Sequence, residues 1–132
     1  MSDPTALKAS LTQLCAGLVY ISETDADIRI ADLGPLEPGV TAIAKAVGST
    51  DGSGEVSSVE EFFSPLIAVY DDATPERAAR AKRFLELRSW LEENLRDLAV
   101  YKFGGVRKQV YVLGRAEDGR LIGISTEAVT TG

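Results

Sequence analysis

The strongest constraint on the fold lies in the last third of the chain, where three runs of strand-like residues follow one another. They read V-Y-K-F (100–103), R-K-Q-V-Y-V-L-G-R (107–115) and R-L-I-G-I-S-T-E-A-V (120–129). Gly104-Gly105 and Asp118-Gly119 separate the runs, and an Asp-Gly pair between alternating runs is a strong hairpin signal. We therefore predict a three-stranded antiparallel meander in this third of the chain.

Helical periodicity predicts two long helices upstream of this meander. The first begins at Asp3-Pro4, because aspartate can cap a helix and proline is preset for its first position. The longest runs from Thr74 to about Leu98, with Thr74 as its cap and Pro75 as its first residue. The predicted buried faces are Leu7, Leu11, Leu14, Cys15 and Leu18 in the first helix, and Ala81, Phe84, Leu85, Arg88, Leu91, Leu95 and Leu98 in the longest, with Leu87 and Trp90 beside that face.

Two shorter helices and one further strand complete the expected elements. Residues 27–33 alternate as a half-buried strand does. The helix signals are Pro38 and Gly48 as start and end of one short helix, and a Ser58–Glu61 capping box with a limit at Pro65 for the other. Strands interleaved with helices predict an α+β fold, a three-layer α/β/α sandwich around a mixed sheet with the C-terminal antiparallel meander. The length of 132 residues, without repeats, predicts a single domain over residues 1–132.

Composition removes several classes of function. The chain has no histidine, which excludes the commonest general base, the commonest zinc ligand and every Ser-His or Cys-His nucleophile. Its one cysteine, Cys15, reads as a small core side chain and suits a reducing compartment. The run from Cys15 to Ile21 is too short to span a bilayer, and Met1-Ser2-Asp3 lacks the basic start of a secretory signal. We expect a cytoplasmic protein that does not contact a membrane and needs no cofactor or metal of its own.

Charge is unevenly spread along the chain. The net charge is −6, but residues 1–76 hold 13 acids and 3 bases, whereas residues 77–132 hold 7 acids and 11 bases. The segment S-E-T-D-A-D at 22–27, which we predict to connect two packed elements, carries three acids with no base between Lys8 and Arg29. Such a surface repels nucleic acid and attracts a basic partner, although a hydrated turn would have the same composition.

Catalysis would have to depend on carboxylates. The candidate acids are Glu23, Asp25 and Asp27, the pair Asp71-Asp72, and the pair Glu60-Glu61. None of these groups has the spacing of a calcium loop, and carboxylates in loops are usually solvated. A carboxylate-dependent hydrolase is therefore the weakest of the functions considered.

Three stretches of the chain resemble the nuclease A inhibitor family, small acidic bacterial proteins that block sugar-nonspecific DNA/RNA endonucleases of the ββα-metal type. They are L-C-A-G-L-V-Y-I-S-E-T-D (14–25), V-E-E-F-F-S (59–64) and the long segment N-L-R-D-L-A-V-Y-K-F through G-I-S-T-E-A-V (94–129). The V-Y-V-L-G and G-I-S-T segments are specific in combination with the upstream S-E pair. The resemblance implies a three-layer α/β/α fold, as the patterns also predict.

The resemblance also implies a set of contact residues. Glu23 matches a glutamate of the family's contact loop that pairs with an arginine of the nuclease active site, and Ser22, Thr24 and Asp25 surround it. Thr131, between Thr130 and Gly132, matches the family's C-terminal threonine, which reaches the magnesium ion of the nuclease. Tyr70, with Asp71 and Asp72, falls where the family has an aromatic and acidic contact loop.

These observations leave two binding functions open. The leading hypothesis is a non-enzymatic inhibitor that plugs the active site of a sugar-nonspecific endonuclease, with the basic cleft of that protein as its partner and no direct contact to nucleic acid. The alternative is an acidic protein-protein interaction module with a different basic partner. In the first case a carboxylate and a terminal oxygen ligand occupy phosphate-like positions without being cleaved.

Overall fold

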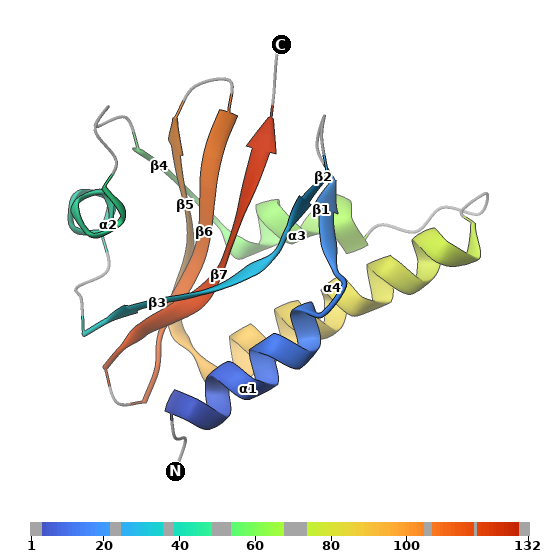
Figure 1. Ribbon diagram of the computed structural model, residues 1–132, viewed down its shortest axis with the longest axis horizontal. Coiled ribbons are helices and arrows are strands. Elements are labelled where there is room, and N and C mark those ends of the chain that lie inside the picture. Colours follow the sequence, from blue (N-terminus) through green and yellow to red (C-terminus); the bar gives the residue numbers. More distant parts are fainter. Residues whose placement is uncertain are drawn as a thin grey trace.

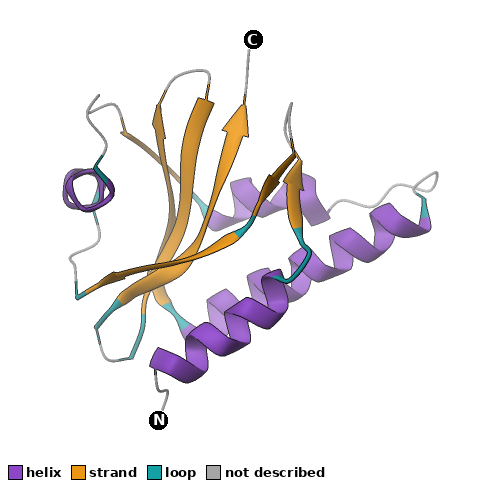
Figure 2. Ribbon diagram, in the orientation of Figure 1, coloured by secondary structure: helices purple, strands orange, loops and turns teal. Residues whose placement is uncertain are grey.

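The computed structural model describes residues 4–21, 25–35, 39–48, 54–67, 74–104, 107–117 and 119–129 (Figures 1 and 2). Within these ranges the chain forms four helices, which are α1 (Pro4–Cys15), α2 (Val40–Val47), α3 (Val59–Ile67) and α4 (Pro75–Asn94). The strands are β1 (Val19–Ile21), β2 (Asp25–Asp27), β3 (Arg29–Gly34), β4 (Gly54–Ser57), β5 (Arg96–Gly104), β6 (Arg107–Arg115) and β7 (Leu121–Val129). An α+β fold is therefore confirmed.

Five of these strands form one sheet in the order β3-β7-β6-β5-β4. Every neighbouring pair is antiparallel, so the prediction of a mixed sheet is wrong. The N-terminal half contributes two strands to this sheet, β3 and β4. They run in the same direction but lie at opposite edges, and α2 connects them across one face (Figure 1). No strand therefore gains the parallel neighbour that a β-α-β unit would give it.

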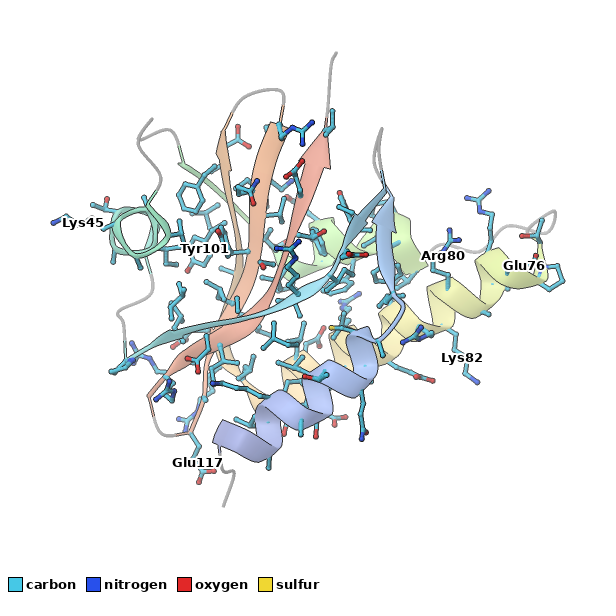
Figure 3. The ribbon with its side chains drawn as sticks, viewed as in Figure 1. Lys45, Glu76, Arg80, Lys82, Tyr101 and Glu117 are labelled. Atoms are coloured by element: carbon cyan, nitrogen blue, oxygen red, sulfur yellow. The ribbon has the colours of Figure 1, made fainter. Side chains whose placement is uncertain are left out.

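Helices cover the two faces of the sheet unequally. On one face, α1, α3 and α4 pack over the larger core, which includes Leu11, Phe63, Phe84, Leu91 and Ile124. On the other face, α2 alone covers a smaller core of Ala31, Ile43, Tyr101, Phe103, Leu113 and Leu121 (Figure 3). Tyr101 is buried in this smaller core.

The longest helix begins as predicted and ends earlier. The Thr74 Oγ1 accepts a hydrogen bond from the Arg77 N–H at 3.2 Å, and Pro75 is the first residue. The helix ends at Asn94 rather than near Leu98, because the chain turns into β5 at Arg96. Its fully buried face holds Ala81, Phe84, Leu87 and Leu91, whereas Leu85, which we had placed on that face, is 47% exposed.

Of the other helix signals, Gly48 and Ser58 are confirmed and Pro65 is not. Asp3 and Pro38 lie outside the described residues, and Leu18, predicted in the first helix, follows its end at Cys15. Gly48 ends α2 in the left-handed conformation at φ 76°, as predicted. The Ser58 Oγ accepts the Glu61 N–H at 3.1 Å at the start of α3. Pro65 does not limit this helix, which continues to Ile67, since Phe62 and Phe63 hold it in the core.

Asp32 joins three segments of the fold. Its carboxylate lies 2.6 Å from the Lys8 Nζ of α1 and 2.9 Å from the Arg120 Nη2 before β7, and it accepts the Gly34 N–H at 2.9 Å. Burial raises the pKa of Asp32, but these hydrogen bonds and the charge of Lys8 outweigh it and lower the pKa from 3.8 to about 2. The clamp therefore holds a charged carboxylate at neutral pH.

Cys15 lies in the core, as predicted, and burial raises the pKa of its thiol to about 11 against the opposing charge of Arg83. Among the helices of the described ranges, none combines the length and apolar character needed to cross a bilayer.

Candidate protein-binding site

The described part of the acidic segment, residues 25–27, is one strand of a small hairpin. β1 and β2 pair in antiparallel fashion, with Val19 opposite Asp27 and Ile21 opposite Asp25. Residues 25–27, which we predicted to be part of a connection, are therefore a strand. The carrier of the predicted contact residues is thus a two-stranded arm separate from the main sheet (Figure 1).

Side-chain contacts attach this hairpin to the body of the protein. The half-buried Tyr20 of β1 stacks on Phe62 of α3, with ring centroids 5.3 Å apart and planes 13° apart. On the second strand, the buried Thr126 Oγ1 of β7 donates a hydrogen bond to the Asp27 carbonyl at 3.0 Å. A two-stranded ribbon is marginally stable alone, so these contacts maintain its position.

The hairpin reaches toward the C-terminal end of β7. β3 runs antiparallel to β7, with Arg29 opposite Ser125, so the chain before Arg29 extends along β7 in the direction of Val129. The paired ends Ile21 and Asp25 consequently lie at the same end of the molecule as Val129 (Figure 1). Two chain segments predicted to bind the partner, residues 22–24 and 130–132, adjoin these ends in the sequence.

Most of the predicted contact residues fall outside the described residues. Asp25 is described as the first residue of β2, paired with Ile21. The others lie outside those ranges: Ser22, Glu23, Thr24, Tyr70, Asp71, Asp72, Thr130, Thr131 and Gly132. The structure therefore describes the hairpin and the end of β7, which adjoin the predicted site, but it does not test the site itself.

A polar hollow of about 420 Å³ lies beside the hairpin. It is lined by Ala26, Asp27, Arg29, Arg107, Gln109, Tyr111, Ser125, Thr126 and Glu127. The Glu127 carboxylate accepts hydrogen bonds from Arg107 Nη1 at 2.6 Å and Gln109 Nε2 at 3.1 Å. Two acids line the hollow, Asp27 and Glu127. Because Glu127 is already hydrogen-bonded to Arg107 and Gln109, the two carboxylates are not arranged as a catalytic acid–base pair.

Another described pair of candidate acids, Glu60 and Glu61, lies in α3. Glu60 and Glu61 are exposed in the first turn of α3, where negative charge suits the helix dipole. In the part of the chain that the structure describes, no group of three or more acidic, cysteine or histidine residues is arranged to hold a metal ion.

The acidic and basic halves of the sequence are interleaved in space. The N-terminal half supplies the edge strands β3 and β4, and the C-terminal half supplies the centre of the sheet. Asp32 pairs with Arg120, and the Glu55 carboxylate lies 3.6 Å from the Lys108 Nζ. Among the described acids of residues 1–76, Asp32 and Glu55 therefore lie at the two edges of the sheet beside bases of the C-terminal half.

Sequence reasoning missed the residues that hold the hairpin. Tyr20 and Thr126 contact partners distant in the chain, and neither belongs to a local motif. Tyr20 lies in an unbroken apolar run without alternation, and β1 and β2, at three residues each, are too short for a local pattern to predict a strand.

Fold and hairpin together define an acidic α+β protein with a small arm beside the end of its main sheet. The chain belongs to the nuclease A inhibitor-like family, because the family model described as "Nuclease A inhibitor-like protein" matches residues 5–131. Membership implies the role of a nuclease inhibitor, with a nuclease as the protein partner. No curated protein matches the chain.

Proposed function

We propose that the protein is a non-enzymatic inhibitor that acts as a single domain and plugs the active site of a sugar-nonspecific endonuclease of the ββα-metal type. The observation that carries this proposal is the family match over residues 5–131. The position of the hairpin agrees with it, since the arm that bears Glu23 adjoins the same end of the molecule as β7.

Glu23 is the proposed central contact. It lies in the chain between the paired residues Ile21 and Asp25, so its position depends on the hairpin. A nuclease active site is shaped for a phosphodiester, and a carboxylate that meets an arginine there makes a charge-assisted hydrogen bond of the same kind. Because a carboxylate offers no scissile bond, it occupies the site without being turned over.

Two further segments complete the proposed contact. Thr130, Thr131 and Gly132 follow β7, and an oxygen of Thr131 would bind the magnesium ion that belongs to the nuclease. Tyr70, with Asp71 and Asp72, follows α3, whose Phe62 already stacks on Tyr20 of the hairpin. Aromatic residues are frequent anchors of protein interfaces.

The test is a titration of a purified ββα-metal nuclease with the parent protein, Glu23→Gln and the control Glu86→Gln. The control removes the same charge from an exposed position of α4. Breaking a buried charge pair costs about 2–5 kcal/mol, so we expect Glu23→Gln to inhibit roughly 30-fold to several thousandfold more weakly. Thermal unfolding of both variants should match the parent.

Equal inhibition by Glu23→Gln and the parent would show that S-E-T-D is a hydrated turn here. Failure of the parent to bind any nuclease of this type would instead favour the interaction module with a different basic partner. Hydrolysis of a phosphoester by the protein alone, lost on mutation of Asp27, would support the carboxylate-dependent hydrolase.

A further inference from the structure

One long-range contact joins α4 to the chain that leads into the hairpin. The Arg83 Nη2 donates hydrogen bonds to two backbone carbonyls, Leu14 O at 3.0 Å and Ala16 O at 2.7 Å. These two residues span the end of α1, which lies alongside α4 (Figure 1). A single guanidinium nitrogen thus bridges the last turn of one helix and the residue after it.

This contact completes the hydrogen bonding at the end of α1. The last carbonyls of a helix have no partner within the helix. Here the Gln13 and Cys15 carbonyls accept the N–H groups of Ala16 and Leu18, which leaves Leu14 O and Ala16 O for Arg83. The last turn of α1 has no basic residue of its own, so Arg83 also supplies the cation that the helix dipole favours there.

The same turn sets the direction of β1. Gly17 has a positive φ of 70°, which reverses the chain, and Leu18 enters the core at 3% exposure. Val19 then begins β1. Only these few residues separate the carbonyls held by Arg83 from the first strand of the hairpin, so a shift at the end of α1 is transmitted directly into β1.

We infer that Arg83 is a positioning residue for the β1–β2 hairpin, because by fixing the end of α1 it holds β1 and β2 in one orientation relative to the body of the protein. Its consequence for binding rests on the proposed inhibitor function. The helix that carries Arg83 also begins directly after residues 68–73, the second proposed contact segment. Helix α4 thus contacts the chain that leads into the hairpin, and in the sequence it follows the second proposed contact segment.

Preorganisation of this kind raises affinity because less ordering is left to the moment of binding. Among the described residues, three contacts attach the hairpin and the chain leading into it to the body of the protein. They are the Arg83 bridge, the Tyr20–Phe62 stack and the Thr126 hydrogen bond. Arg83 is the attachment at the base of the hairpin, where the hairpin leaves α1. Removing it should loosen the arm while leaving the main sheet paired.

Amide hydrogen exchange of the free protein tests the positioning directly. The variants are Arg83→Gln, Arg83→Lys and the matched control Lys82→Gln, whose exposed side chain projects away from the body of the protein (Figure 3). We expect faster exchange at residues 18–27 in Arg83→Gln, an intermediate change in Arg83→Lys, and no change in Lys82→Gln. Exchange in β5, β6 and β7 should stay as in the parent. Unchanged exchange in the hairpin, or a uniform rise over the whole sheet, would overturn the inference.

Nuclease titration well below the unfolding temperature supplies the second readout. Arg83→Gln should inhibit roughly tenfold more weakly, equivalent to about 1.4 kcal/mol of lost preorganisation, and Lys82→Gln should stay within about twofold of the parent. Equal inhibition by Arg83→Gln and Lys82→Gln would remove the binding consequence. If the parent itself inhibits no nuclease, the proposed function fails, and hydrogen exchange alone decides the role of Arg83.

Discussion

The β1–β2 hairpin and the central strands β5, β6 and β7 hold their shapes by different interactions. Each hairpin strand has three residues, and its attachments to the body are an aromatic stack and hydrogen bonds from Thr126 and Arg83. Each central strand has nine residues, most of them paired with a neighbouring strand, and contributes side chains to both cores. The region that makes the fold and the region proposed to bind a partner can therefore be perturbed separately.

The largest expected effect tests the central strands. In Gly123→Ala, the new Cβ would lie 1.8 Å from the Val112 carbonyl oxygen, a backbone atom of the paired strand. We expect a loss of about 3 kcal/mol in the free energy of unfolding, because close-packed strands cannot separate without losing their ladder. Urea unfolding measures it. Gly39→Ala, where the added Cβ meets nothing within 4 Å, is the control, and equal stability of the two variants would contradict the packing argument.

A smaller effect is expected from the Asp32 clamp, which ties α1 to the edge of the sheet. Since folding lowers the pKa of Asp32 to about 2, its stabilisation is complete above pH of about 4 and disappears as the pH falls through 2. Asp32→Asn should lose about 1–2 kcal/mol at neutral pH, where partly exposed partners reduce the full value.

Unfolding of Asp32→Asn and the parent is compared across the acid range. The difference in stability should shrink as the pH falls toward 2. A difference that stays constant from neutral pH to pH 2 would show that the carboxylate charge is not what stabilises this edge.

The hairpin itself should cost less when disturbed. Aromatic pairs contribute roughly 0.5–1.5 kcal/mol beyond the burial of their surface, so Tyr20→Leu, which keeps an apolar side chain but removes the stack on Phe62, should lose about 1 kcal/mol. Hydrogen exchange should rise in β1 and β2 and stay unchanged in β6. Loss of protection throughout β6 would mean that hairpin and sheet unfold as one unit, and the distinction between them would fail.

The smallest expected effect lies at the outer end of the central strands. Glu127→Gln breaks the exposed ion pair with Arg107, which should change stability by no more than about 0.5 kcal/mol. A melting curve close to that of the parent is expected. If the variant also weakens nuclease inhibition, the hollow beside the hairpin belongs to the binding surface.

The sequence predicts the regular parts of this fold well and the hairpin poorly. Thr74-Pro75, Ser58-Glu61 and Gly48 are local signals, because each places a capping atom within a few residues of its partner. Leu85 was mispredicted because its four-residue spacing from Ala81 suggests the same face, whereas it lies about 100° around the helix from the buried Phe84. β3 is antiparallel because it pairs with β7, a strand distant in the sequence, and no local pattern encodes such a pairing.

The candidate site shows the same division. Glu23 and Thr131 came from motifs that resemble the nuclease A inhibitor family, and their roles stay predictions, because both residues lie outside the described ranges. Tyr20, Arg83 and Thr126 could not be predicted, since each acts through a contact to a distant part of the chain. β4 was missed because its four residues, G-E-V-S, carry one exposed apolar side chain, Val56.

The order of strands in the sheet also sets the timing of folding during synthesis. β3 leaves the ribosome early, yet both its sheet partner β7 and the Thr126 that holds the hairpin are made near the end of the chain. Pairing over such sequence separations is slow, and until it occurs β3 and β4 remain unpaired edges that can associate with other chains. The hairpin takes its place beside β7 only in this last step, so a nascent chain cannot position the hairpin, which we propose to bind the partner, before the whole sheet has closed.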